Sequence, residues 1–133
     1  MSNCKRFHYY GFITGLVDAV TLRVDIDLGF GIWLRDRNIR IINTVVPDRD
    51  STNTLESVVG KRIYETSKKY VLNKECKILS CSLDSFGRII GDVFIDMRPE
   101  KSYYLWMLKN NYGKKFKPGV TWSDEELNAI LQR

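Results

Sequence analysis

The sequence predicts an α+β domain in which five strands close a small barrel, and three observations favour this fold. Alternating apolar and polar residues indicate strands in the first third of the chain, and a helical repeat of apolar residues follows them. Two more strand-like segments and two short helical segments complete the sequence. We expect residues 1–133 to form one domain, with residues 1–6 and 113–122 less ordered than the rest.

Three strands are expected before the first helix. The first covers residues 8–16, with two glycines as bend or bulge points. In residues 20–28, Val, Leu and Ile alternate with Thr, Arg and Asp, which is the period of a half-buried strand. After the glycine-punctuated LGFGIW, residues 38–46 are rich in Ile and Val and stop at Pro47, so they form the third strand.

Helices and a hairpin account for the remaining chain. In residues 54–72, apolar side chains recur at steps of three and four, as on one face of a helix. Strands are expected at 76–83 and 88–95, joined by the turn-type sequence DSFG. A helix over 102–112 and a last helix that begins at the capping box SDEE (123–126) follow. Five strands, a helix between the third and fourth, and two C-terminal helices are the arrangement of an OB-type barrel.

The charge balance suits a polyanionic partner. Lys and Arg number 21 against 16 Asp and Glu, which gives a net charge of +5. Residues 61–77 hold six basic and two acidic side chains, and residues 109–117 hold four lysines and no acid. Such segments are typical of nucleic-acid-binding surfaces and equally of solvated faces, so charge alone leaves both interpretations open.

Membrane and metal signals are both missing from the sequence. No apolar run approaches the ~20 residues of a membrane helix, and the N-terminus lacks the apolar core of a signal peptide. We therefore expect a cytoplasmic protein with no membrane partner. Cys4, Cys76 and Cys81 include no Cys-x-x-Cys pair and His8 is the single histidine, so we expect three reduced thiols and no metal site.

Three short motifs lie in a fixed order around the expected central helix. VDAVT covers residues 17–21, IRI at 39–41 is followed by PD at 47–48, and SFGR covers 85–88. In these motifs and their spacing, residues 10–122 resemble the staphylococcal-nuclease-like (thermonuclease-type) family. The segment DIDLGFGIWLRDRNIRI is similar to members found in bacterial viruses.

The resemblance implies roles for five positions. The family's two metal-ligand aspartates fall on Val20 and Val45, and Asp48 stands where the family has the glutamate proposed as general base. Arg40 and Arg88 match the family's two phosphate-binding arginines. Calcium takes about six to eight oxygen ligands and valine supplies none, so we expect the calcium site to be lost and no catalytic site to be intact.

These positions predict a catalytically degenerate nuclease-fold protein that binds nucleic acid or a nucleotide phosphate without cleaving it. Arg40 and Arg88 are the expected phosphate-binding residues. Lys114, Lys115 and Lys117 are the expected additional contacts to the nucleic-acid backbone. No metal or other cofactor is expected.

Three alternatives stay open. Asp18, Asp25 and Asp27 are candidates for a relocated metal site in a divergent, active DNA or RNA nuclease, although strand parity puts the last two on the other face from Val20. In the second alternative, the protein is a viral interaction factor that inhibits a host enzyme in the host cytoplasm. In the third alternative, both arginines pair with acidic neighbours such as Asp18 or Asp48, and the cleft is shut.

The aromatic cluster of the expected helix 102–112 has two interpretations. At helical spacing its members are core residues, but exposed members would be stacking platforms or interface anchors. The cluster consists of Tyr103, Tyr104, Trp106 and Tyr112.

Overall fold

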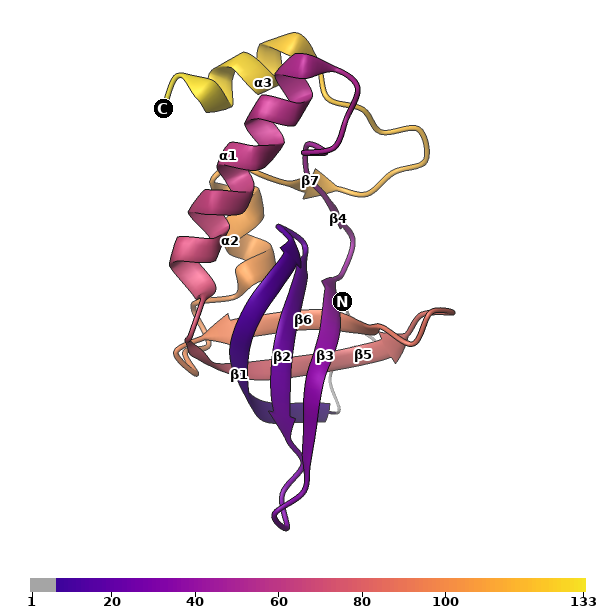
Figure 1. Cartoon of the computed structure of the whole chain (residues 1–133), viewed down its shortest axis with the longest axis vertical. Helices are drawn as coiled ribbons and strands as arrows, with labels where there is room; N and C mark the ends of the chain where they lie inside the picture. Colours follow the sequence, from indigo (N-terminus) through magenta and orange to yellow (C-terminus); the bar gives the residue numbers. More distant parts are fainter. Residues whose placement is uncertain (1–6) are drawn as a thin grey trace.

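Residues 7–133 are described by a computed structural model, in which five strands close a barrel (Figure 1). The strands are β1 (Phe7–Asp18), β2 (Thr21–Asp27), β3 (Trp33–Ile41), β5 (Glu75–Leu83) and β6 (Ile89–Ile95). Their order is β1-β2-β3-β6-β5, and β5 pairs with β1 to close the barrel. Every barrel pairing is antiparallel except that of β3 with β6. The topology is compatible with an OB-fold and confirms the predicted fold class.

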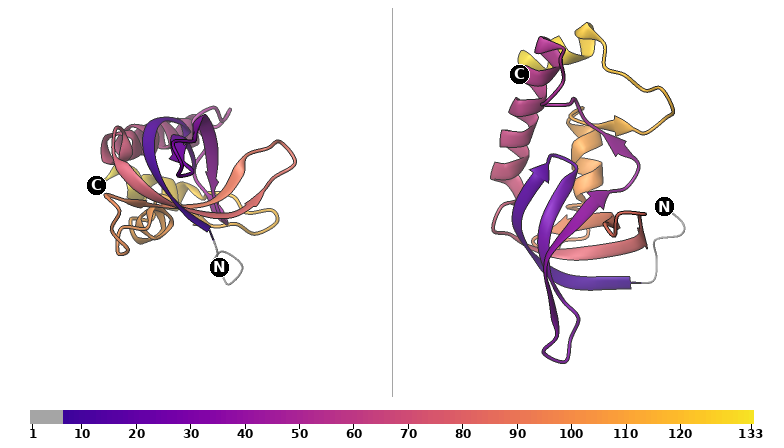
Figure 2. Two further views of the ribbon diagram at one scale, coloured as in Figure 1. Left: turned by 90° about the horizontal axis from the view of Figure 1, so that it is seen from below. Right: turned by 45° about the vertical axis from the view of Figure 1, so that its right-hand side comes forward.

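The helices gather at one end of the barrel (Figures 1 and 2). They are α1 (Thr54–Val71), α2 (Tyr103–Lys109) and α3 (Asp124–Leu131), so one helix precedes the fourth barrel strand and two follow the fifth, as predicted. Two short strands, β4 (Thr44–Val45) and β7 (Lys114–Lys115), pair antiparallel and bring the C-terminal segment beside the chain that leaves β3. At the opposite end, the β2–β3 hairpin extends away from the body.

The predicted alternation of β2 is confirmed, but the strand begins later than expected. Its buried apolar residues are Leu22, Val24 and Ile26. Arg23 between them is exposed. Val20 is also buried, but it lies in the turn between β1 and β2, so the strand starts at Thr21. The side chain of Asp18 holds this turn, because its Oδ1 accepts a hydrogen bond from the backbone N–H of Val20 at 2.9 Å.

The third predicted strand is displaced and divided. β3 begins at Trp33, which pairs with Asp27 of β2, although the charged run RDR at 35–37 obscures the strand period in the sequence. The chain turns at Asn43, whose φ is 53°, and β4 then forms a separate strand. Asparagine is one of the few residues besides glycine that adopt this left-handed conformation readily.

Each helix begins at a side-chain cap; the caps are Asn53, Ser102 and Ser123. At α3, Ser123 and Glu126 form the predicted capping box, in which each side chain accepts a hydrogen bond from the backbone N–H of the other residue. The second helix ends at Lys109 rather than at residue 112, because Asn111 leaves the helical region with a φ of 58°.

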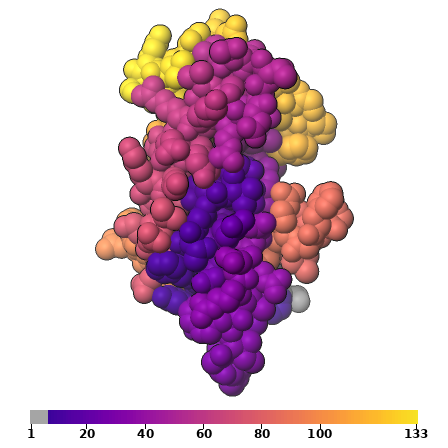
Figure 3. Space-filling view, viewed as in Figure 1, coloured from indigo at the N-terminus to yellow at the C-terminus, as the bar shows by residue number. Residues whose placement is uncertain are grey.

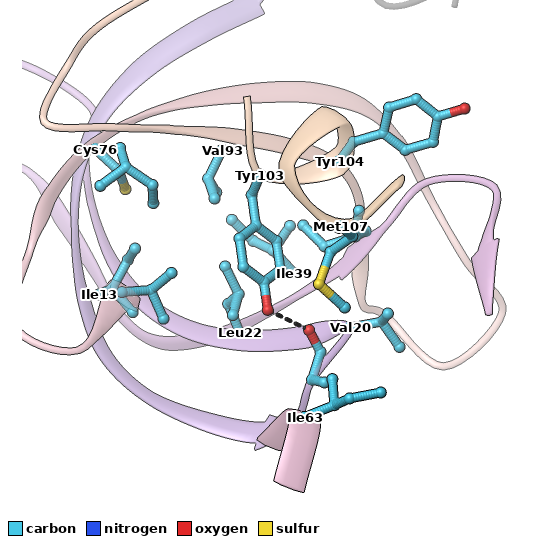
Figure 4. Close-up of a cluster of buried hydrophobic side chains, with 14 of the residues drawn as sticks. Ile13, Val20, Leu22, Ile39, Ile63, Cys76, Val93, Tyr103, Tyr104 and Met107 are labelled. Atoms are coloured by element: carbon cyan, nitrogen blue, oxygen red, sulfur yellow. Dashed lines mark hydrogen bonds between the residues drawn. The ribbon is translucent and has the colours of Figure 1, made fainter. Parts of the chain in front are cut away.

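The core fills the barrel and continues under the helices (Figure 4). The aromatic cluster of α2 belongs to it: Tyr103 is fully buried and Tyr104 is almost fully buried. Trp106 is partly buried and stacks on Tyr70, with ring centroids 4.4 Å apart. Tyr112 also packs against the core, so the core interpretation of the cluster is confirmed.

The cysteines lie in different environments. Cys76 is buried and free, and burial raises the pKa of its thiol to about 12, so it stays protonated at neutral pH. Cys81 is disulfide-bonded, which makes the prediction of three reduced thiols wrong. Spacing along the sequence does not show which segments a fold brings together. Cys4 lies outside the described residues.

Within residues 7–133, no helix is both long and apolar enough to cross a membrane. In the same part of the chain, no three His, Cys, Asp or Glu side chains gather in a way that could hold a metal ion. The segment 113–122, expected to be less ordered, contains β7.

Candidate functional site

A cleft of about 350 Å³ opens where the β1–β2 turn meets the chain that follows β3. Residues 17–20, Arg40 and residues 45–50 form two of its walls, and α1 contributes Gly60 and Tyr64. Four predicted site residues therefore share one cleft: Val20, Arg40, Val45 and Asp48.

The wall formed by α1 depends on Gly60. A Cβ atom at this position would lie 2.5 Å from the backbone nitrogen of Arg49 and 2.7 Å from the carbonyl oxygen of Pro47. Backbone atoms cannot yield as the end of a flexible side chain can. Only glycine therefore lets α1 approach the 47–49 segment this closely.

Arg40 is held by backbone carbonyls rather than by carboxylates. Its Nη1 donates to the carbonyl of Ile41 at 2.6 Å, and its Nη2 donates to the carbonyl of Thr44 at 2.5 Å. It forms no ion pair with any described residue. The pKa of Arg40 is lowered, mainly by burial. The charge of Asp18 raises this pKa, and the charge of Arg88 lowers it. A guanidinium remains charged under these conditions, so the cleft contains a half-buried positive charge without a paired carboxylate.

Arg88 lies near Arg40 but does not line the cleft. β3 and β6 pair in parallel, and Arg40 lies opposite Ile90, two residues after Arg88. By strand parity, the side chains of Arg40 and Arg88 therefore leave the same face of the sheet. The Nε of Arg88 donates to Oδ2 of Asp84 at 2.6 Å. Its two Nη atoms form no hydrogen bond with a described residue. An acidic neighbour thus pairs with Arg88, but it is Asp84 rather than Asp18 or Asp48.

The residues at the two positions that the resemblance assigns to metal ligands do not fit a calcium ion. The side chains of Val20 and Val45 offer no oxygen, and the side chain of Val20 is buried. The nearby carboxylates form hydrogen bonds with the backbone. Asp18 accepts a hydrogen bond from the N–H of Val20, and Asp48 accepts one from the N–H of Asp50, both at 2.9 Å.

Asp25 and Asp27 do not supply a relocated site with Asp18. Both lie on β2, outside the cleft lining. Asp25 pairs with Arg35 at 3.1 Å, and Asp27 accepts a hydrogen bond from the backbone N–H of Gly29 at 2.8 Å. These carboxylates stabilise the β2–β3 hairpin.

Arg49 and Tyr64 also line the cleft, although the sequence did not single them out. The Nη2 of Arg49 donates to the carbonyl of Val17 at 2.6 Å, and its guanidinium lies 4.2 Å from the ring centre of Tyr64. The hydroxyl of Tyr64 donates to the carbonyl of Leu16 at 3.2 Å. Arg49 directly follows the PD motif at 47–48, which is the one sequence signal that points to it.

The three predicted lysines differ in their contacts. Lys114 forms an ion pair with Glu126 at 2.9 Å, whereas Lys115 and Lys117 are exposed. The β4–β7 pairing places Lys115 opposite Thr44, whose carbonyl holds the cleft guanidinium. The geometry therefore favours Lys115 and Lys117 over Lys114 as contacts for any ligand that extends out of the cleft.

Comparison with protein-family models and with curated proteins finds no match for this chain. The fold and the cleft define an α+β barrel protein, compatible with an OB-fold, that presents an unpaired arginine in a cleft. The resemblance to the staphylococcal-nuclease-like family rests on the order of the three motifs.

Proposed function

We propose that this is a catalytically degenerate, nuclease-fold protein of the staphylococcal-nuclease-like type. It binds the phosphate groups of a nucleic acid or nucleotide without cleaving them. The observation that carries the proposal is the guanidinium of Arg40, which lines a cleft and has no carboxylate partner among the described residues. A phosphate oxygen entering the cleft supplies the missing negative charge and accepts charge-assisted hydrogen bonds.

Arg40 retains donors for such a ligand. The two carbonyls each take one hydrogen from an Nη atom, which leaves the Nε–H and the second hydrogen of each Nη. The carbonyls already fix the side chain of Arg40. Binding a phosphate therefore costs less conformational entropy than it would at a freely moving arginine side chain. Arg49 in the cleft and Arg88 beside it add positive charge around the same position.

The same cleft supports binding without cleavage. Hydrolysis of a phosphodiester requires neutralisation of charge at phosphorus and activation of a water molecule, which a metal ion supplies in metal-dependent nucleases. Val20 and Val45 cannot hold that ion. The side chain of Asp48 is one methylene shorter than that of a glutamate, and one of its oxygens accepts a hydrogen bond from the N–H of Asp50.

Fluorescence anisotropy with short single- and double-stranded DNA and RNA tests the proposal. Affinity should fall with salt, with a log-log slope of about 0.7–0.9 for each phosphate contacted. Arg40→Ala should weaken binding by about 1.5–3 kcal/mol, the contribution of hydrogen bonds to a charged group. Arg98→Ala removes the same charge from an exposed residue outside the cleft and should leave affinity almost unchanged.

Two controls complete the experiment. Circular dichroism of both variants shows whether the barrel is retained, and Arg40→Lys keeps the charge but cannot hold both carbonyls and a phosphate. Identical affinities for the unmodified protein and Arg40→Ala would contradict the proposal. Cleavage in calcium, magnesium or manganese that disappears in Arg40→Ala would favour a divergent active nuclease instead.

A further inference from the structure

The β2–β3 hairpin ends in an apolar tip that the cleft does not use. The tip, residues 28–33, has the sequence LGFGIW and contains no charge. Phe30 is 100% exposed, Ile32 55%, Leu28 37% and Trp33 36%. Contiguous exposed apolar residues of this kind mark an interaction site, whereas single exposed ones do not.

The tip is a defined turn that directs Phe30 outward. Three successive residues, Gly29, Phe30 and Gly31, have positive φ values of 81°, 58° and 74°. The backbone N–H groups of Leu28 and Ile32 donate to the carbonyls of Ile32 and Gly29, both at 2.9 Å. Phenylalanine rarely adopts a positive φ, so the turn keeps an unfavourable conformation at a side chain that contacts nothing else in the protein.

At the base of the tip lies an aromatic row of two residues with polar ends, Trp33 and Tyr10 of β1. Tyr10 and Trp33 both pair with Asp27, from opposite sides of β2. Their rings meet edge to face, with centroids 6.3 Å apart. The hydroxyl of Tyr10 donates to Glu75 at 2.9 Å, so the polar end of this ring has a partner at the base of the hairpin.

Charged groups follow beyond the aromatic row. The guanidinium of Arg35 lies 4.6 Å from the ring centre of Trp33 and pairs with Asp25 at 3.1 Å. From the tip inward, the hairpin therefore presents aliphatic and phenyl groups, then amphipathic rings beside the carboxylate of Asp27, then the Arg35–Asp25 ion pair. This is the polarity order that a protein meets on passing from the hydrocarbon edge of a bilayer, through the headgroups, to water.

We propose that the tip of the β2–β3 hairpin inserts into the surface of a lipid bilayer and holds the protein there peripherally. Phe30, Ile32 and Leu28 enter the acyl boundary, and Tyr10 and Trp33 lie at the headgroups. The hairpin stands clear of the barrel, so a flat surface reaches it without touching the body (Figures 1 and 3). The expectation of no membrane partner rested on spanning segments, and this contact does not cross the bilayer.

The charge of the hairpin favours lipid over nucleic acid as the occupant. Between residues 23 and 37, the hairpin carries three arginines and three aspartates: Arg23, Asp25, Asp27, Arg35, Asp36 and Arg37. A polyanion gains little from a balanced surface, whereas apolar insertion needs no net charge. Binding should therefore extend to zwitterionic vesicles and change little with salt.

Co-sedimentation with phosphatidylcholine vesicles, with and without anionic phosphatidylserine, tests the proposal. Phe30→Asn should reduce vesicle binding at least about tenfold, because burial of a phenyl group corresponds to more than one factor of ten in partition. Asparagine accepts a positive φ better than phenylalanine, so this variant keeps the turn. The control is Phe86→Asn, which removes an aromatic ring that is 84% exposed on the β5–β6 hairpin.

The supporting result is salt-insensitive binding to both vesicle types that Phe30→Asn reduces and Phe86→Asn does not. Failure of the unmodified protein to bind any vesicle would overturn the proposal. Binding only to anionic vesicles, lost in high salt and unaffected by Phe30→Asn, would also overturn it and assign the contact to basic side chains. Self-association abolished by Phe30→Asn, without vesicle binding, would assign the tip to a protein surface instead.

Discussion

The hydroxyl of Tyr103 donates a hydrogen bond to the backbone carbonyl of Ala19 at 2.5 Å, and both residues are buried (Figure 4). Tyr103 is the first residue of α2, whereas Ala19 lies in the β1–β2 turn that lines the cleft. Burial raises the pKa of Tyr103, so its hydroxyl remains protonated and donates throughout the usual pH range. The bond therefore joins α2 to a wall of the cleft.

Tyr103→Phe should lower the free energy of unfolding by about 1–3 kcal/mol, because the buried carbonyl of Ala19 loses its side-chain donor while the ring still fills its space. Urea unfolding measures the change. Tyr70→Phe is the matched control, because the Tyr70 hydroxyl forms no hydrogen bond with a described residue and its ring stacking is retained. Equal losses in the two variants would show that the Tyr103 bond contributes nothing specific.

Gly60→Ala should be destabilising although alanine is the better helix former. The added Cβ would meet the backbone of Arg49 and Pro47 at 2.5 and 2.7 Å, so the 47–49 segment must move. Phosphate binding should weaken together with stability, because that segment carries Arg49 and part of the cleft wall. Thermal unfolding and anisotropy measure the two effects, with Lys61→Ala, an exposed neighbour on α1, as control. A more stable Gly60→Ala protein would contradict the close approach.

Asp84 should stabilise the β5–β6 turn only in its ionised form. Partial desolvation raises the pKa of Asp84, but hydrogen bonds from Arg88 and from the backbone of Phe86, with the charge of Arg88, lower it overall. A lowered folded-state pKa means that the contribution is fully present above the unfolded value, about 4, and is lost as pH falls through the folded pKa. Denaturation across pH should show the stability difference from Asp84→Asn shrinking only below about pH 4. A difference that stays constant into acid would contradict this.

The same variant should strengthen anion binding at neutral pH. Asp84→Asn keeps an oxygen for the turn but removes the charge that competes for Arg88. The Asp84–Arg88 ion pair lies at the surface and is partly exposed, and such pairs contribute little, so the expected gain in affinity is about two- to fivefold. Anisotropy with the same oligonucleotides measures it, and the gain should vanish when Arg88→Ala is combined with Asp84→Asn. An undiminished gain in that double variant would exclude Arg88 from the binding surface.

The unmodified protein should show no thermal shift in millimolar calcium, since a ligand that does not bind cannot stabilise. Changing Val20 and Val45 together to Asp should lower stability without calcium by about 1–3 kcal/mol, because carboxylates replace apolar groups. It should also introduce a calcium-dependent rise in Tm. Sodium chloride of equal ionic strength is the control. A calcium shift in the unmodified protein would point to a different metal site and to the enzyme alternative.

Local features of the fold could be predicted from the sequence, because the signal and the structure lie in the same few residues. The alternation in β2 and the capping box at Ser123 are of this kind. The start of β3 at Trp33 could not be predicted, since that strand is held by backbone pairing while its charged side chains show no apolar period.

The sequence singled out some of the residues that line the cleft, such as Arg40, but not their contacts. The motif spacing identified Arg40 and Arg88, yet their hydrogen-bond partners depend on tertiary structure. Arg40 binds the carbonyl of Thr44 in β4, which pairs with β7 near the other end of the chain. Arg49 escaped prediction because its place directly after the PD motif is the one signal in the sequence, whereas its role comes from its stacking on Tyr64 of α1.

The parallel pairing of β3 with β6 sets the order in which the protein can close its barrel during synthesis. Ile39 pairs with Ile89, and β1 pairs with β5, so two barrel seams join segments far apart in the chain. Pairings of this kind form slowly, because closing the long intervening loop costs conformational entropy before any stabilising contact forms. A nascent chain that has not yet extended to β5 and β6 displays the unpaired edges of β1 and β3. Such edges attract other strands, so cells that make this protein quickly should need chaperones to keep the unfinished barrel from aggregating.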